Sequence, residues 1–116
     1  MLEFQNITER LIQALPELEE TYRDEEKVER NREFFEHVRE ATEEYFTLLD
    51  AWEESAHILS KEGRILVFPQ QIDATKENMQ ALIMHSHYKD VRKRKYMEIL
   101  QACHYIFTQS LEVDES

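Results

Sequence analysis

The chain has 116 residues, of which 41% are hydrophobic and 34% charged, and 25 acidic against 14 basic side chains give a formal net charge of −11. Its single Gly excludes glycine-rich phosphate-binding loops, and its single Cys excludes an intramolecular disulfide and cysteine-rich zinc sites. The acidic balance argues against nucleic acid and anionic membrane surfaces as partners, because both attract Lys and Arg. The length suits one domain over residues 1–116, and the lack of a signal peptide or membrane-spanning apolar run leads us to expect a cytoplasmic protein.

The first predicted helix covers about residues 2–26. Its hydrophobic residues recur at steps of three and four, as they do on the buried face of an amphipathic helix. Pro16 lies inside this pattern and lacks the backbone N–H that a helix interior needs, so we expect a kink or a break there. The inward positions are Phe4, Ile7, Leu11, Ala14, Leu18 and Thr21.

The second predicted helix, about residues 30–61, has the clearest pattern. Its apolar face is wider than the seam of a two-stranded coiled coil, which indicates a helix packed in a bundle. This phase turns Trp52 toward the interior and His57 toward water, and Gly63 stands where a left-handed cap would end the helix. The seam consists of Phe34, Val38, Ala41, Tyr45, Leu48, Trp52, Ser55 and Leu59, widened by Phe35, Thr42, Leu49 and Ala56.

Two further helices are predicted, over about residues 69–87 and 91–111. Pro69 suits the first turn of the third helix, where its missing N–H would have no partner, and Asp90 is a plausible N-cap for the fourth. Four helices with short connections favour an all-α fold, an antiparallel up-down-up-down four-helix bundle. The inward positions are Ile72, Thr75, Met79, Leu82, Ile83 and Ser86 in the third helix and Tyr96, Ile99, Leu100, Cys103, Ile106 and Phe107 in the fourth.

Charge is distributed unevenly along the chain. Residues 1–62 carry 18 acidic and 7 basic side chains, whereas residues 63–116 carry 7 of each. The bundle topology brings a basic turn at the start of the fourth helix close to an acidic corner after the first. We favour mutual neutralisation of the two clusters, in pairs worth about 0–1 kcal/mol each. The alternatives are that the basic turn binds an anionic partner, or that it is a solvated face with no role. The basic turn consists of Arg92, Lys93, Arg94 and Lys95, and the acidic corner of Asp24, Glu25 and Glu26.

Four consecutive apolar residues, 65–68, connect the second and third helices without helical periodicity. They form either a lid that folds over one end of the bundle or an exposed apolar patch of the kind that marks an interface. We favour the lid, because an exposed run of this length would promote aggregation. In the interface interpretation, the partner contacts are Ile65, Leu66 and Phe68.

Few residues are candidates for chemistry. Glu54 and His57 form one Glu-x-x-His tetrad, but a di-iron bundle needs two, and the phase of the second helix turns His57 away from the core. His37, His85 and His87 are predicted near one end of the bundle and are the alternative candidates for a metal or small-ligand site. The thiol of the single Cys lies on an inward seam, where it acts as a small hydrophobe rather than a nucleophile.

The third helix and the start of the fourth carry distinctive residues: Phe68-Pro69-Gln70-Gln71-Ile72-Asp73, then Glu77-Asn78-Met79, Leu82, Ser86 and Tyr88, then Lys93-Arg94-Lys95-Tyr96. In these residues the chain resembles the YppE-like family, a group of small uncharacterised proteins from Bacillus-type bacteria. The resemblance covers about residues 66–107, and the acidic first half matches mainly in helical pattern. It implies a compact cytoplasmic four-helix bundle with no known enzymatic role and supplies no catalytic residues. His85 and His87 stand where Gln and an aromatic residue are expected.

These features together predict a non-enzymatic protein-interaction module with no cofactor. It would act by contact with a protein partner or as a homodimer, with neither nucleic acid nor a membrane as its target. The alternative is a helical bundle that binds a metal or a small ligand through the three histidines at residues 37, 85 and 87.

Overall fold

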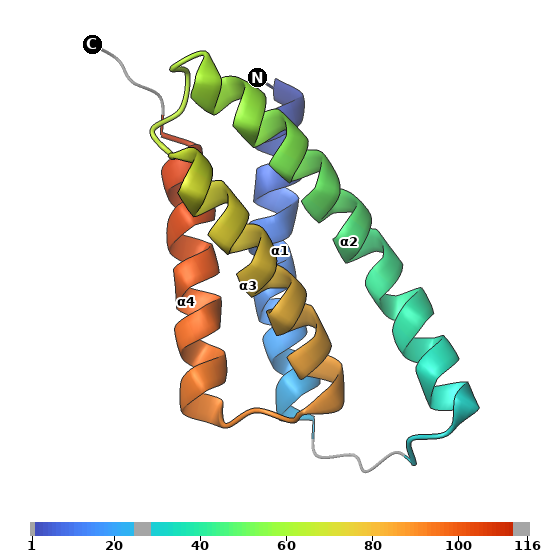
Figure 1. The fold of residues 1–116 in the computed structure, drawn as a ribbon. Helices are drawn as coiled ribbons and strands as arrows, with labels where there is room; N and C mark the ends of the chain where they lie inside the picture. The colour runs from blue at the N-terminus through green and yellow to red at the C-terminus, as the bar shows by residue number, and fades with distance from the viewer. Residues whose placement is uncertain (1, 25–28, 113–116) are drawn as a thin grey trace.

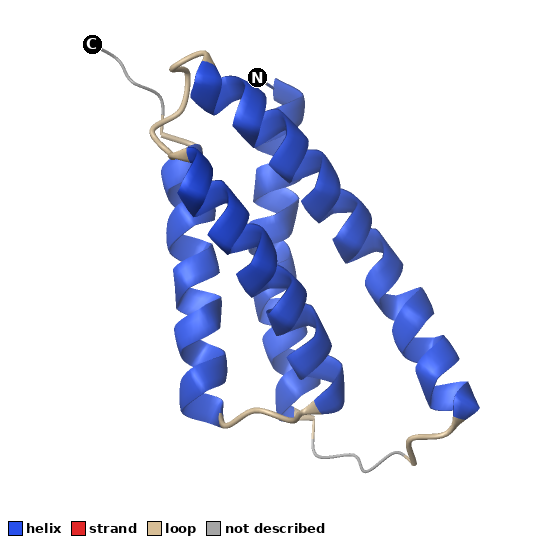
Figure 2. Ribbon diagram, in the orientation of Figure 1, coloured by secondary structure: helices blue, strands red, loops and turns tan. Residues whose placement is uncertain are grey.

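Four helices in antiparallel succession form the bundle in the computed structural model, which describes residues 2–24 and 29–112 (Figure 1). Helices 1 and 3 in chain order run in one direction, and helices 2 and 4 run in the other. No described residue belongs to a strand (Figure 2). The predicted all-α four-helix bundle is therefore confirmed. The helices are α1 (Leu2–Arg23), α2 (Arg32–Lys61), α3 (Pro69–Tyr88) and α4 (Lys93–Ser110).

Each helix packs against the next one along the chain, and α4 also packs against α1. One end of the bundle therefore gathers the end of α1, the start of α2, the end of α3 and the start of α4 (Figure 1). The connection between α2 and α3 lies at the opposite end, as the topology predicted. Among the described residues, no helix combines the length and the apolar character that crossing a bilayer requires.

Helix α1 continues through Pro16, so the chain does not break there. A proline at this position leaves the carbonyl of Ile12 without its usual helical donor, at a cost of about 3 kcal/mol. On the opposite face, Leu11, Leu15 and Leu18 are at most 1% exposed. Burying each of these leucines contributes about 1.5–3 kcal/mol, so tertiary packing outweighs the local cost of the proline.

The core is centred on Trp52, which is fully buried and meets the ring of Phe107 edge to face with 5.0 Å between ring centroids. The inward phase predicted for Trp52 is therefore correct. All six inward positions predicted for α3 are buried, and four of the six predicted for α4 are. In α4 the buried four are Tyr96, Ile99, Cys103 and Phe107.

The buried face of α2 is rotated from the predicted seam. Ala41 is exposed and Ser55 only half-buried, whereas Thr42, Leu49 and Ala56 are buried. Thr42 can occupy a buried position because its hydroxyl donates to the Val38 carbonyl at 2.8 Å. Trp52 and Leu59 belong to both seams, which is why the two phases were hard to separate from hydrophobicity alone.

The first half of α2 diverges from the rest of the bundle, and its start lies well to the side of α1 and α3 in Figure 1. Phe35 in this half is 48% exposed. Phe34 is half-buried and touches the ring of Tyr88 edge to face, with centroids 5.7 Å apart. The aromatic residues at the start of α2 therefore rest on the end of α3 without entering the core.

The connection between α2 and α3 alternates between inward and outward side chains. Ile65 and Val67 are 5% and 1% exposed, whereas Leu66 and Phe68 are 45% and 68% exposed. Gly63 starts the turn with φ 70, and Ser60 donates its hydroxyl to the Val67 carbonyl at 2.7 Å. The segment is thus a lid on its inner side. The predicted partner contact at Ile65 is wrong, because this side chain is buried in the core.

At the other end of the bundle, a pair of stacked tyrosines joins α1 to α4. The rings of Tyr22 and Tyr96 lie 3.9 Å apart and nearly parallel. The Tyr96 hydroxyl is 2.6 Å from the Ser86 hydroxyl, which donates to the Leu82 carbonyl. The buried polar groups at this end are therefore satisfied, and they fix α1, α3 and α4 relative to one another.

Raising the pH from about 9 to about 12 is expected to lower the free energy of unfolding. Burial raises the pKa of the Cys103 thiol from 9.0 to about 12, and that of the Tyr96 phenol from 10.0 to about 12. The folded state keeps these protons at pH values where the unfolded chain releases them, so the stability is intact below about pH 9 and is lost as the pH rises. Urea unfolding followed by circular dichroism across this range measures the loss.

Two substitutions control this experiment. Cys103→Ala should remove the part of the decline that starts near pH 9, and Tyr96→Phe should reduce the part that starts near pH 10, to which Tyr45 also contributes. A free energy of unfolding that stays constant up to about pH 12 in the wild type would show that burial does not raise the pKa values of Cys103 and Tyr96.

Candidate functional site

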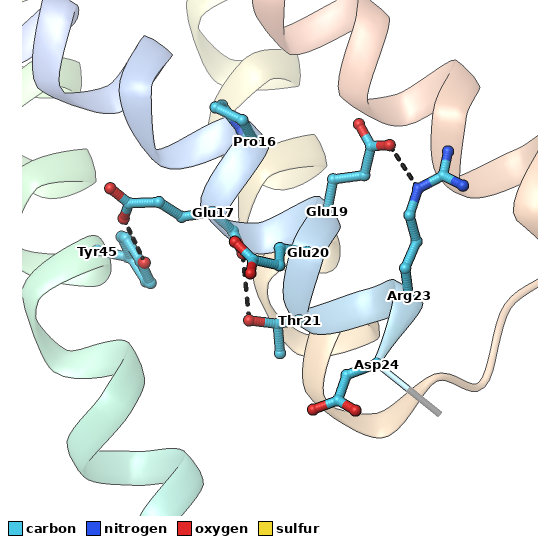
Figure 3. Close-up of a pocket in the computed structure, with 8 residues that line it drawn as sticks. All are labelled: Pro16, Glu17, Glu19, Glu20, Thr21, Arg23, Asp24 and Tyr45. Atoms are coloured by element: carbon cyan, nitrogen blue, oxygen red, sulfur yellow. Dashed lines mark hydrogen bonds and ion pairs between the residues drawn. The ribbon is translucent and has the colours of Figure 1, made fainter. Parts of the chain in front are cut away.

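A surface cavity of about 820 Å³ lies between α1 and α2, where the two helices begin to diverge. Its lining is mostly charged and comes from the second half of α1, with an aromatic side chain from α2 (Figure 3). The lining residues are Pro16, Glu17, Glu19, Glu20, Thr21, Arg23, Asp24 and Tyr45.

A polar network joins the two helices beside this cavity. The Tyr45 hydroxyl donates to Glu17 Oε1 at 2.8 Å, and Arg10 contacts the same carboxylate at 3.2 Å. Arg10 also reaches Glu44 of α2 at 3.3 Å. Burial, followed by the hydrogen bond to Glu17, raises the pKa of Tyr45 to about 12. Tyr45 therefore acts as a neutral donor that fixes Glu17 in the cavity wall.

The remaining acidic side chains of the cavity differ in their partners. Glu19 and Arg23 pair at 2.6 Å on the side of α1 away from Tyr45 (Figure 3). Glu20 is exposed and forms no ion pair with any residue that the structure describes. It is therefore available to a positively charged group from outside.

A second cavity, of about 400 Å³, continues the first toward the start of α2, and the two share Thr21 and Asp24. His37 and His87 both line it. Burial, followed by the charges of His37 and Lys89, lowers the pKa of His87, so this imidazole is neutral near pH 7. The full lining is Thr21, Asp24, Glu29, Asn31, Glu33, Phe34, His37, His87 and Lys89.

We name the two connected cavities the acidic groove. Among the residues that the structure describes, six carboxylates line it against two basic side chains, Arg23 and Lys89. Within residues 2–24 and 29–112, no ion pair is formed by Glu20, Glu29 or Glu33. In the described part of the chain, the groove therefore has more acidic than basic side chains, beside aromatic surface. The carboxylates belong to Glu17, Glu19, Glu20, Asp24, Glu29 and Glu33.

The basic turn lies at the same end of the bundle as the acidic groove. All four of its side chains are exposed, and in the described part of the chain its one ion pair joins Arg94 to Glu98 of the same helix at 3.6 Å. Lys89 donates to the backbone carbonyl of Asp24. Glu25 and Glu26 of the predicted acidic corner lie outside the described residues, so neutralisation by them stays a prediction.

The three histidines proposed as an alternative ligand set do not gather at one point. His37 and His87 share a cavity, but His85 Nδ1 lies 2.6 Å from Asp90 Oδ1. Residues two apart on a helix point to different sides, and this separates His85 from His87. Their common site is therefore reduced to His37 and His87.

His57 has carboxylate partners that the sequence did not predict. Its side chain is 37% exposed, as the phase predicted, but its Nε2 lies 2.8 Å from Asp73 Oδ1 on α3. Glu53, four residues earlier on α2, completes a group of three ligand-bearing side chains, while Glu54 is exposed and takes no part. The spacing of Glu53 and His57 was a visible signal, since residues four apart share a helix face.

The comparisons with known proteins point to one family. A family model described as a bacterial domain of unknown function, DUF1798, matches residues 8–113. The uncharacterized protein YppE of Bacillus subtilis (strain 168) is 28% identical over 100 residues, covering 85% of this chain and 81% of YppE.

The solved structures of yppE from Bacillus subtilis share the fold. The crystal structure has a TM-score of 0.78 at 22% identity and covers 92% of this chain and 88% of that one. The solution NMR structure has a TM-score of 0.77 at 22% identity, with coverages of 95% and 90%. At this identity the likeness supports the helical bundle alone.

Proposed function

This chain belongs to the bacterial family of unknown function DUF1798, and we propose that it is a non-enzymatic protein-interaction module that binds a cationic segment of a partner protein in the acidic groove. The observation that supports the proposal is that Glu20, Glu29 and Glu33 line a groove open to the surface and form no ion pair within residues 2–24 and 29–112. The buried single cysteine fits a reducing compartment, so we propose the cytoplasm as the site of action.

The chemistry of the groove matches an amphipathic segment rich in Lys or Arg. Carboxylates along both walls can pair with the charged ends of these side chains. Tyr45 and Phe34 offer half-buried rings, against which the aliphatic stems of Lys and Arg can pack. The same carboxylates would repel the phosphates of a nucleic acid, which supports a protein as the partner.

The basic turn and the outward residues of the α2–α3 connection are proposed as secondary contacts. Arg92, Lys93 and Lys95 are exposed without an ion pair among the described residues, which suits an anionic surface. Because Ile65 is buried, Leu66 and Phe68 are the apolar contacts that we propose in this connection. A second copy of this chain carries both a basic turn and an acidic groove, so a homodimer is one form that the interaction can take.

Neutralising two groove carboxylates is expected to weaken binding of a lysine-rich amphipathic peptide about tenfold, because two exposed ion pairs of up to about 1 kcal/mol each are lost. The variant is Glu20→Gln with Glu33→Gln. The control, Glu40→Gln with Glu43→Gln, makes the same charge change at exposed positions of α2 outside the groove. Titration followed by NMR chemical shifts gives both the affinity and the residues contacted.

The outcomes separate the proposal from its competitors. Equal weakening in both variants would reduce the effect to net charge and contradict a groove site. Stronger binding of a glutamate-rich peptide, lost on Arg92→Glu with Arg94→Glu, would move the partner site to the basic turn. Self-association that these same substitutions remove would identify the partner as a second copy.

A further inference from the structure

Three side chains that can ligate a metal converge between α2 and α3, on the half of α2 remote from the acidic groove. They are Glu53 and His57 of α2 and Asp73 of α3. One ligand atom from each lies within 4.8 Å of the other two, and His57 Nε2 is 2.8 Å from Asp73 Oδ1. The cluster thus spans two helices, and it combines an imidazole nitrogen with two carboxylates.

The spacing is close to that of a tetrahedral zinc site. Zinc binds histidine nitrogen and carboxylate oxygen at about 2.0–2.2 Å, which sets ligand atoms about 3.4 Å apart. To reach that distance, His57 Nε2 and Asp73 Oδ1 would move apart from 2.8 Å by about 0.6 Å, and atoms at the 4.8 Å limit would approach by about 1.4 Å. The side chains of His57 and Asp73 are 37% and 65% exposed, so rotation about side-chain bonds can supply this shift.

Lys76 is the cation that now neutralises part of the cluster. Its ammonium lies 2.8 Å from Glu53 Oε1 and 2.9 Å from Asp50 Oδ1. Because Lys76 holds two carboxylates, it can keep Asp50 when Glu53 turns toward a metal. The Lys76 ammonium competes with a metal for Glu53, so it lowers the affinity of the site for the metal but does not prevent binding.

We propose that Glu53, His57 and Asp73 form a surface site for a divalent transition-metal ion, with Zn²⁺ as the best match. One nitrogen and two oxygen donors suit zinc, while Mg²⁺ and Ca²⁺ demand six or more oxygen ligands. Three protein ligands leave a fourth position for water. The bound ion would link α2 to α3. The metal site shares no residue with the acidic groove.

The test is zinc titration of tag-free protein by calorimetry, with Co²⁺ absorption to report four-coordinate geometry. Wild-type protein is expected to bind one equivalent. His57→Gln should lower the affinity at least about 100-fold, because even indirect support of a ligand is worth 10–100-fold. Asp73→Asn should act in the same direction. Circular dichroism checks that these exposed substitutions leave the fold intact.

The chain offers a matched control in His85, which pairs with Asp90 at 2.6 Å in the same His-carboxylate arrangement. No third ligand-bearing side chain completes that pair within the described residues. His85→Gln should therefore leave zinc binding unchanged, and Lys76→Met should strengthen it about 3- to 10-fold by removing the competing cation. Binding that survives His57→Gln, falls equally with His85→Gln, or is missing from the wild type would overturn the site and reduce the cluster to an ion-pair network.

Discussion

Replacing Trp52 with Ala is expected to lower the free energy of unfolding by about 3–5 kcal/mol. The indole is fully buried, and it packs edge to face on Phe107 at 5.0 Å. Removing it opens a cavity between α2 and α4 that rigid helices cannot close. Chemical unfolding followed by circular dichroism measures the loss, since Trp52 is the single tryptophan and its fluorescence disappears with it. Domains of this kind have a total free energy of unfolding of about 5–15 kcal/mol, so the loss is a large fraction of the stability.

Two variants separate the cavity from other causes. The Trp52 indole N–H is buried and has no acceptor among the described residues. Trp52→Phe removes this unpaired donor along with part of the ring, so it should cost less than half as much as Trp52→Ala. Tyr105, 64% exposed on α4, should tolerate Ala within about 0.5 kcal/mol. Equal losses at Trp52 and Tyr105 would show that burial does not control the effect.

Val67→Asp is expected to lower the free energy of unfolding by about 4 kcal/mol or more, a large part of the roughly 5–15 kcal/mol that keeps a domain of this kind folded. Val67 is 1% exposed in the α2–α3 connection, so the new carboxylate would lose its water without gaining a partner. Thermal unfolding by circular dichroism, with a dye that binds exposed hydrophobic surface, detects the change.

The neighbouring positions provide the control for this substitution. Leu66→Asp and Phe68→Asp place the same charge on side chains that are 45% and 68% exposed, and each should cost less than about 1 kcal/mol. The contrast between adjacent residues tests the lid directly. Similar melting temperatures for Val67→Asp and Phe68→Asp would mean that the connection does not cover the core.

The sequence predicted the helices well where burial is strong on one face. The six inward positions predicted for α3 are all buried, because its hydrophobic residues, at steps of three and four, allow a single helical phase. In α2 the apolar stripe is wide enough for two helical phases. The observed phase buries Thr42, whose hydroxyl donates to the Val38 carbonyl of the same helix. At Pro16 the predicted kink or break is not a break, because the leucines that pack on the core side of α1 stabilise the helix through the proline.

The candidate site was harder to predict than the fold. The acidic groove depends on how far α2 diverges from α1, which no periodicity encodes. The charge excess of the first half was visible in the sequence, but its concentration beside Tyr45 was not. His57 faces outward as expected, yet its partner Asp73 comes from α3, and pairing across helices depends on their relative rotation and height.

The adjacency of α1 and α2 has a further consequence. Residues 1–62, which include both helices, carry the whole excess of negative charge, whereas residues 63–116 have equal numbers of acidic and basic side chains. The uneven charge gives the molecule an electric dipole transverse to the bundle. A positively charged protein arriving by diffusion would experience a torque that turns the α1–α2 side toward it before the surfaces meet. Such pre-orientation would speed association in dilute salt and fade as ionic strength shortens the range of the field.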